Sequence, residues 1–296
     1  MVEGVKVRDS LTDRMFMIVI GILLLTITAI VLVPLIYVVA SSFSSPQAVV
    51  SGQVSLWPVD FNIRGYETAL SNPRILSGFL NTIMYTLGGT AISVFLTVLL
   101  AYPLSRPDLP GRNIILGLLI FTMLFQGGLI PTFLVVRSLG LLNTPWALLI
   151  PNAVGVWQVL IAITYFRETI PSELYQAARI DGATDRQILA RIVLPLSKPM
   201  LAVIALMYAI GQWNSYFDAL IYIRSPELYP LQLVLREILI LNQISGSDVL
   251  QMVERQQLAQ LLKFSLVVVS TVPILLLYPF VAKYFTKGML VGSVKG

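Results

Sequence analysis

Long, nearly charge-free apolar stretches constrain this sequence more than any other feature. A helix needs roughly 20 mostly apolar residues to cross the hydrocarbon core of a bilayer. Six stretches satisfy this requirement, at about Phe16 to Ser42, Ser77 to Leu104, Ile114 to Val136, Trp146 to Phe166, Pro199 to Tyr222 and Phe264 to Phe285. The sequence therefore predicts an all-α membrane protein with about six transmembrane helices.

The composition agrees with a lipid environment and excludes several kinds of chemistry. Hydrophobic residues make up 56% of the chain and charged residues 12%, and the mean hydropathy is +0.82. Cysteine and histidine are both absent, which removes disulfides, thiolate nucleophiles, imidazole bases and the usual zinc and haem ligands. We expect no metal site and no catalytic residue. The net charge of +5 is attributed to cytoplasmic loops, so no nucleic-acid partner is expected.

The distribution of Lys and Arg predicts the orientation of the chain. With the N-terminus inside, thirteen of the 20 basic residues lie in inside pieces and seven in much longer outside loops. Both termini are therefore expected in the cytoplasm. The predicted organisation is a leader at 1–15, one membrane domain at 16–286 with outside segments 43–76 and 223–263, and a cytoplasmic tail at 287–296.

The inside loop, residues 171–199, has the local signals of two short helices joined by a turn. Gly182 is suited to the left-handed position that ends the first helix. Thr184 and Gln187 form a capping-box pattern that starts the second helix, which Pro195 stops or kinks before Pro199 opens the fifth span.

Apolar and small residues recur at helical spacing in this loop, namely Leu174, Ala177, Ala178, Ile188 and Ile192. They could form an apolar knob that seats in the groove of another protein. Equally, the loop could be a solvated connector whose apolar residues lie back on the bilayer.

The loop resembles the EAA loop of binding-protein-dependent ABC importer permeases. The family core falls on Gln176, Ala177, Ala178, Asp181, Gly182, Ala183, Ile192 and Pro195. Gln176 departs from the glutamate of the family pattern, which puts in doubt an ion pair at that position but not the docking. The resemblance implies the type I ABC importer permease fold, in a bacterial cytoplasmic membrane.

Two further segments extend the resemblance to the sugar-transporting branch of the family. Phe125 to Thr132 reads FQGGLIPT, and Leu139 to Thr144 reads LGLLNT. Within that branch the chain is similar to the MalG-like permeases of oligosaccharide importers, and to the alginate-oligosaccharide importers in particular.

The resemblance also implies a set of partners. They are a second homologous permease, two cytoplasmic ATPase subunits docked on the EAA loop, an extracytoplasmic solute-binding protein, and membrane lipid. The chain has no phosphate-binding loop of the Gly-x-x-x-x-Gly-Lys-Ser/Thr type. ATP and Mg are therefore expected on the partner ATPase, with no cofactor on this chain.

Polar side chains inside the predicted spans are candidates for the translocation path, because they are costly in lipid unless they face a cavity or another helix. These candidates are Gln126, Asn152, Gln212, Trp213, Asn214, Tyr216 and Asp218. Aromatic rings, amides and a carboxylate suit a carbohydrate path. The alternative is hydrogen bonding between helices together with an interfacial aromatic belt.

The outside segment 223–263 is too apolar for a free loop. The resemblance implies contact with the binding protein, whereas packing on the partner permease is the alternative, and both could hold.

Three other functions are alternatives to a sugar ABC importer. The coupling motif says little about cargo, so an importer of a non-sugar solute is the alternative within the same class. An ion-coupled secondary transporter usually has carboxylates in mid-membrane and repeated halves, which this chain lacks. A membrane enzyme would need a catalytic cluster that the sequence does not offer.

Overall fold

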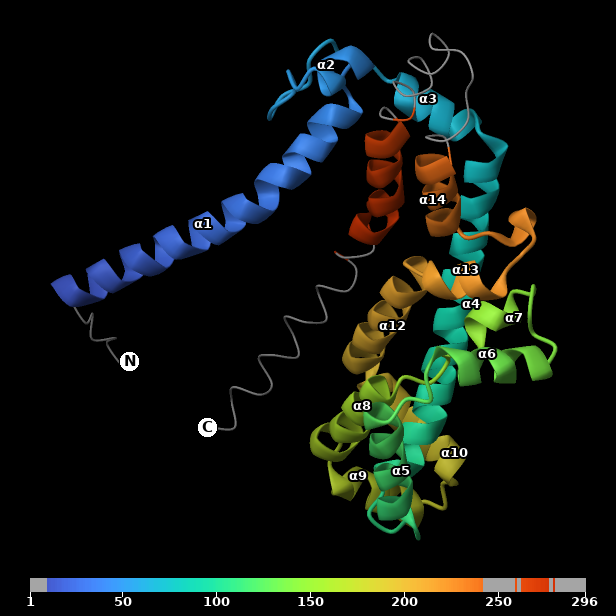
Figure 1. Ribbon diagram of the computed structural model, residues 1–296. Coiled ribbons are helices and arrows are strands. Elements are labelled where there is room, and N and C mark those ends of the chain that lie inside the picture. Colours follow the sequence, from blue (N-terminus) through green and yellow to red (C-terminus); the bar gives the residue numbers. More distant parts are fainter. Residues whose placement is uncertain (1–9, 242–258, 260–261, 277–278, 280–296) are drawn as a thin grey trace. The chain divides into compact units, whose positions relative to one another are not determined.

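The computed structural model describes residues 10–241, 259, 262–276 and 279 (Figure 1). Every regular element in this described part is helical. The main elements, in chain order, are α1 (Leu11–Ser42), α2 (Pro46–Val50), α3 (Arg64–Ser71), α4 (Pro73–Leu104), α5 (Arg112–Leu124), α6 (Leu129–Ser138), α7 (Trp146–Leu149), α8 (Val156–Thr169), α9 (Ser172–Ile180), α10 (Asp185–Ile188), a π-helix (Leu189–Val193), α11 (Leu194–Leu196), α12 (Lys198–Trp213), α13 (Phe217–Tyr222), a 3₁₀-helix (Pro226–Leu228) and α14 (Leu231–Leu241).

Internal contacts divide the chain into two compact units. The first comprises Met1–Ser71 and Leu241–Val269, and the second comprises Asn72–Ile240 and Ser270–Gly296. A helix at Leu262–Leu276 therefore contributes its first part to one unit and its second part to the other.

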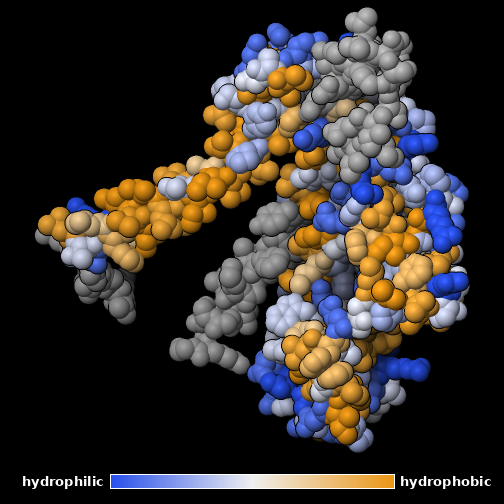
Figure 2. Space-filling model, viewed as in Figure 1, coloured by the Kyte–Doolittle hydropathy of each residue, from blue (hydrophilic) through white to orange (hydrophobic). Residues whose placement is uncertain are grey.

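In the first unit, α1 is an apolar helix that buries little of itself within this chain. It opens with a capping box in which Ser10 and Asp13 satisfy each other's backbone N–H groups. No residue of α1 is buried before Ala40, and Figure 2 shows hydrophobic side chains along its surface. Such an all-round apolar helix is stable where lipid or another protein covers it.

The second unit is built around α4, which packs on α7, α8 and α12. The buried positions of α4 are largely small or hydroxyl-bearing residues, among them Gly78, Thr82, Gly89, Ser93 and Thr97. In a membrane the hydrophobic effect does not drive helices together, so helix association depends on close packing, which small residues allow. The main apolar core joins the end of α4 to α8, α9 and the start of α12.

Three of the predicted spans are broken helices. Helices α5 and α6 are bent by 115° at their junction, where Gly128 has a φ of +85°. Helices α7 and α8 are separated by 150–155, and α12 and α13 by 214–216. In the described part of the chain, 2 helices are each long and apolar enough to cross a bilayer. The number of spans rises to as many as 4 if each of the two bent helix pairs counts as one span.

Pro195 was predicted to stop or kink the second loop helix, and it does not stop it. The helix continues through the π-helix Leu189–Val193 and α11, and the chain bends by 81° only between Leu196 and Lys198. The wider turn of a π-helix offers a way to accommodate the missing N–H of proline without ending the helix. Pro199 lies in the first turn of α12, as predicted.

The described part of the second outside segment folds back on its own subunit. The Thr82 hydroxyl accepts a hydrogen bond from the Leu231 N–H at 2.8 Å, and the Asn81 amide donates to the Glu227 and Tyr229 carbonyls. The Tyr85 hydroxyl donates to the Leu228 carbonyl at 2.9 Å. Packing on this subunit is thus an arrangement that sequence reasoning missed.

Several predictions fall outside the described residues. They concern most of the leader, the segment 242–258, the inner end of the sixth span and the tail 287–296.

Candidate functional site

The tip of the loop 171–199 has the predicted glycine turn and capping box. Helix α9 ends at Ile180, and Gly182 adopts a φ of +74°, which costs glycine little. The Thr184 hydroxyl accepts from the Gln187 N–H, and the Gln187 side chain accepts from the Thr184 N–H, so α10 begins with a capping box. Two short helices therefore meet at a glycine turn.

The residues of the EAA-like core divide between the protein interior and the surface. Ala178 is buried, and Ala183 and Ile192 pack against the same core as Tyr175 and Ile188. The exposed members of the core are Gln176, Ala177, Asp181, Gly182 and Pro195. The interior members hold the loop in place, and the exposed members are the ones available to another protein.

Ile180 belongs to the exposed side of the loop, although sequence reasoning did not select it. Its side chain is 86% exposed at the end of α9. Covering a large aliphatic side chain with a partner protein removes apolar surface from water and is therefore favourable. The helical spacing of this short segment gave no sign of its exposure, because Ile180 has the same apolar character as the buried Ile188.

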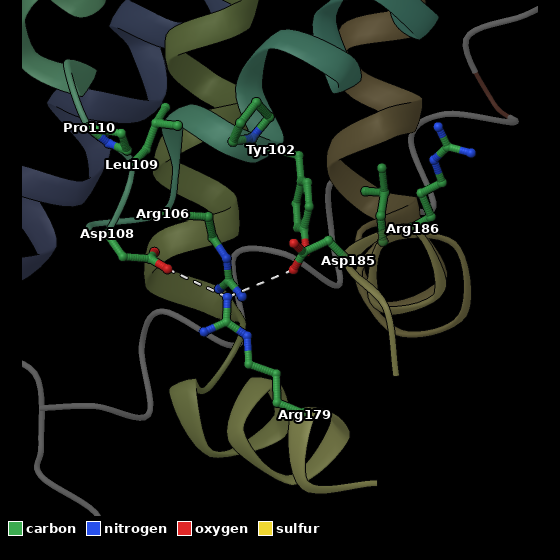
Figure 3. Close-up of a pocket in the computed structure, with 10 residues that line it drawn as sticks. Tyr102, Arg106, Asp108, Leu109, Pro110, Arg179, Asp185 and Arg186 are labelled. Carbon is green, nitrogen blue, oxygen red and sulfur yellow. Dashed lines mark hydrogen bonds and ion pairs between the residues drawn. The ribbon is translucent and has the colours of Figure 1, made fainter. Parts of the chain in front are cut away.

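Beside α9, the turn between α4 and α5 encloses a cavity of about 390 Å³ (Figure 3). The guanidinium carbon of Arg106 lies 3.3 Å from the centroid of the Tyr175 ring and 5.6 Å from that of Tyr102. Arg179 forms ion pairs with Asp108 at 3.5 Å and with Asp185 at 3.8 Å. Figure 3 shows Arg106 and Arg179 extending into the space between these two carboxylates.

The charge states around this cavity follow from local contacts. A backbone hydrogen bond within Asp108, reinforced by Arg179, lowers the pKa of the Asp108 carboxyl despite partial desolvation. Burial raises the pKa of the Tyr175 hydroxyl, and the nearby Arg106 opposes this shift only in part. At neutral pH, Asp108 is therefore an anion and Tyr175 an uncharged ring that presents its π face to a cation.

A second candidate site lies at the helix breaks and contains most of the predicted path residues. Two adjoining cavities of about 380 and 820 Å³ share Asn152, Gly155, Gln158, Phe217 and Asp218. The Asn152 amide donates to the Asp218 carboxylate at 2.8 Å. Gln212, Asn214 and Tyr216 line the smaller cavity, and Gln126 lines the larger one.

Trp213 is the exception among the predicted path residues. Its side chain is only 4% exposed, its indole N–H donates to the Ser270 carbonyl at 2.9 Å, and its ring meets Phe79 edge to face. It lines neither cavity. The assignment of Trp213 to the path is therefore not supported, and the alternative of contacts between helices fits this residue.

The lining residues of the two cavities offer hydroxyl, amide and carboxylate groups, together with the faces of Trp157, Tyr216 and Phe217. Neither lining includes a Lys or Arg among the described residues. Amides and carboxylates hydrogen-bond to sugar hydroxyls, and aromatic rings pack on sugar faces. Among the described residues, no group of His, Cys, Asp and Glu side chains could hold a metal ion.

Comparison with known proteins places these features in a family. Over 285 residues, 96% of this chain and 99% of the relative, the chain is 43% identical to the polygalacturonan/rhamnogalacturonan transport system permease protein YtcP of Bacillus subtilis. The chain belongs to the permease subunits of sugar ABC importers. Protein LplC of Bacillus subtilis is 42% identical over 268 residues, covering 90% of each chain. No family model matches the chain.

A solved structure supports the same assignment for the fold. The chain matches a crystal structure of a bacterial ABC transporter involved in the import of the acidic polysaccharide alginate, with a TM-score of 0.87 and 36% identity. The match covers 95% of this chain and 100% of that chain. This sugar ABC permease is thus a membrane-embedded transport subunit and not an enzyme, and it works with other components of an ABC transporter.

Proposed function

We propose that this permease is one of two homologous subunits that carry an oligosaccharide inward across the bacterial cytoplasmic membrane. ATP hydrolysis on two separate ATPase subunits, which hold ATP and Mg, drives the movement. An extracytoplasmic binding protein delivers the sugar, and both termini of this chain lie in the cytoplasm. The loop 171–199, called the coupling loop from here on, receives the ATPase.

The exposed tip of the coupling loop is the observation that carries this proposal. Tyr175 and Ala178 face the subunit core, while Gln176, Ala177 and Ile180 face outward on the same short helix. A short helix that is anchored on one side and exposes the small Ala177 and the apolar Ile180 on its free side fits a groove in a partner. The bilayer-facing alternative is less favourable, because exposed Gln176 and Asp181 flank the same surface.

The two cavities at the helix breaks support a sugar cargo. Their amides and the Asp218 carboxylate suit the hydroxyl groups of a sugar. One relative is named as a polygalacturonan/rhamnogalacturonan transport permease, and the matching solved structure belongs to a transporter involved in the import of the acidic polysaccharide alginate. Since no Lys or Arg of the described part of the chain lines these two cavities, we propose that a uronic acid carboxylate is bound by the partner permease or by the binding protein, while this subunit contacts hydroxyls.

A substitution at the tip of the coupling loop tests the docking. Ile180→Asp places a charge where an apolar contact is expected, and it leaves the subunit core untouched because the side chain is 86% exposed. We expect this variant to insert in the membrane but to lose the ATPase during purification, or to lose sugar-stimulated ATP hydrolysis. Ile180→Val keeps the apolar contact and serves as the matched control.

Retention of the ATPase and of full stimulation by Ile180→Asp would exclude this face of the loop as the docking surface. Equal loss in both variants would indicate that the position is sensitive to packing rather than to charge.

A further inference from the structure

The coupling loop has a second attachment to the membrane helices, besides the chain segments that lead into and out of it. Arg106 lies in the turn that follows α4, far from the loop in sequence. Its half-buried guanidinium group stacks on Tyr175 of α9, with the carbon 3.3 Å from the ring centroid. Tyr175 is only 6% exposed, so the ring under the guanidinium lies within the subunit, while Arg106 is half-buried at the edge of the cavity.

Further aromatic contacts continue from the stack into the membrane helices. The same guanidinium lies 5.6 Å from the Tyr102 ring in the last turn of α4. Tyr102 in turn meets Phe166 of α8 edge to face, with 6.4 Å between ring centroids. The contacts therefore run from α9 through Arg106 to the ends of both α4 and α8.

The ion pair of Arg179 with Asp108 joins the loop to the same turn but is a weaker candidate for this attachment, and the pair with Asp185 stays within the loop. Arg179 is 54% exposed where it meets Asp108 and Asp185. Solvent-exposed ion pairs contribute little and are screened by salt, whereas the half-buried guanidinium of Arg106 lies directly over the ring of a buried tyrosine and is less exposed to that screening. The Arg106 stack is therefore the main connection, and the ion pairs are accessory to it.

Helix α4 is suited to transmit a movement of the coupling loop that reaches it through the Arg106–Tyr175 stack. It runs over Pro73–Leu104 and packs along α12 and α8, two of the helices that line the polar cavities. At its other end, Asn81, Thr82 and Tyr85 hold the outside segment at 227–231. One continuous helix thus joins the loop attachment to the cavity walls and to the outside face.

We infer that Arg106 is a positioning residue for coupling: stacked on Tyr175, it ties the coupling loop to α4, so that movement of the docked loop is passed to the cavity walls. The inference rests on the proposed function. Without the stack, the loop would still bind the ATPase, but its movement would be absorbed by the tip instead of reaching α4.

The test uses the complete importer, purified with its ATPase and permease partners, reconstituted in proteoliposomes and supplied with its binding protein and sugar. The measured quantity is sugar transported per ATP hydrolysed. We expect Arg106→Gln to lower this ratio by roughly two- to thirtyfold, the range found for mutations along coupling networks. Tyr175→Leu should lower it similarly, and the double variant no further, because both remove one contact.

Conservative variants separate positioning from folding. Arg106→Lys keeps a cation over the ring and should restore part of the ratio. Tyr175→Phe keeps the ring and should match the wild type, since the Tyr175 hydroxyl has no hydrogen-bond partner in the described part of the chain. Asp108→Asn is the matched control, because Asp108 lies outside the coupling loop, lines the same cavity and loses only an exposed ion pair with Arg179, so the ratio should stay close to that of the wild type.

An unchanged ratio in Arg106→Gln and Tyr175→Leu would overturn the inference. So would a fall in the amount or melting temperature of the complex with the ratio preserved, since that is the signature of a merely structural role. If the wild-type complex itself showed no sugar-stimulated hydrolysis, the proposed function would fail first, and the inference with it.

Discussion

At the scale of single residues, one tyrosine hydroxyl supports the break between α7 and α8. The Gly155 N–H donates to the Tyr208 hydroxyl at 3.0 Å, and that hydroxyl shares a further hydrogen bond with the Thr97 hydroxyl at 2.7 Å. An N–H group that lies before the first turn of a helix has no intrahelical partner. Tyr208 of α12 supplies one, and it connects the break to α4.

Tyr208→Phe should therefore destabilise the protein by about 1–3 kcal/mol, because it leaves the Gly155 N–H and the Thr97 hydroxyl without this partner. Thermal unfolding of the purified permease in detergent measures the change. Tyr175→Phe is the matched control: the same atom is removed from a buried tyrosine whose hydroxyl has no partner among the described residues. Equal melting temperatures for the two variants would contradict the assigned role of the Tyr208 hydroxyl.

Residue-scale predictions from the sequence succeeded where the cause is local. The glycine turn at Gly182 and the Thr184–Gln187 capping box depend on neighbouring residues, and the structure confirms both. The stack of Arg106 on Tyr175 depends on how distant segments fold together, so no local pattern indicates it. Trp213 was misplaced for the same reason, since its partner carbonyl belongs to Ser270.

At the scale of elements, hydropathy located the apolar segments but not their interruptions. A sliding count of apolar residues cannot distinguish one straight helix from two bent ones. The break at 125–128 could be anticipated, because Gln126, Gly127 and Gly128 interrupt the apolar run. The break at 214–216 could not, because its polar residues suit a cavity-facing helix equally well. Both breaks line the polar cavities, where exposed backbone can be hydrated.

The contact between α4 and α14 depends on one glycine. A Cβ atom at Gly78 would lie 2.9 Å from Val234 Cγ2 and 3.3 Å from the Leu231 backbone. Gly78→Val should push α14 away from α4 and destabilise the protein by about 1–3 kcal/mol, the usual cost of overpacking. Thermal unfolding of the purified permease again measures the effect.

Gly88→Val makes the same change three helical turns along α4, where a Cβ would meet only Leu149 Cδ1 at 4.0 Å. It should leave the melting temperature close to that of the wild type. A smaller loss for Gly78→Val than for Gly88→Val would contradict the close packing of α14 on α4.

At the scale of the whole molecule, the distribution of positive charge predicts orientation, while the natural absence of cysteine makes the prediction easy to test. Gln53 lies in the first predicted outside segment and Thr169 at the end of α8, just before the coupling loop, and both are exposed. The reagent is a maleimide that reaches the outer face of the cytoplasmic membrane in intact cells but does not cross that membrane. It should label Gln53→Cys but not Thr169→Cys. Labelling should reverse in inverted vesicles, and the opposite pattern would place the termini outside.

Sequence alone could predict the class of this permease but not its cargo or its assembly. The coupling loop is a local motif, so its resemblance was visible, and the relatives confirm a sugar ABC permease. The proposed sugar site is built from side chains of α8, α12 and α13 that meet only in the folded protein. In an importer with two permeases, half of the path also belongs to another chain.

Reconstitution tests the central claim most directly. The chain would be purified with the proteins that accompany it and inserted in proteoliposomes with ATP on the coupling-loop side. Uptake of a labelled oligosaccharide would then be measured with its binding protein on the other side. The account predicts uptake that requires ATP and falls with Ile180→Asp. Uptake by the chain alone, driven by an ion gradient and indifferent to ATP, would contradict it.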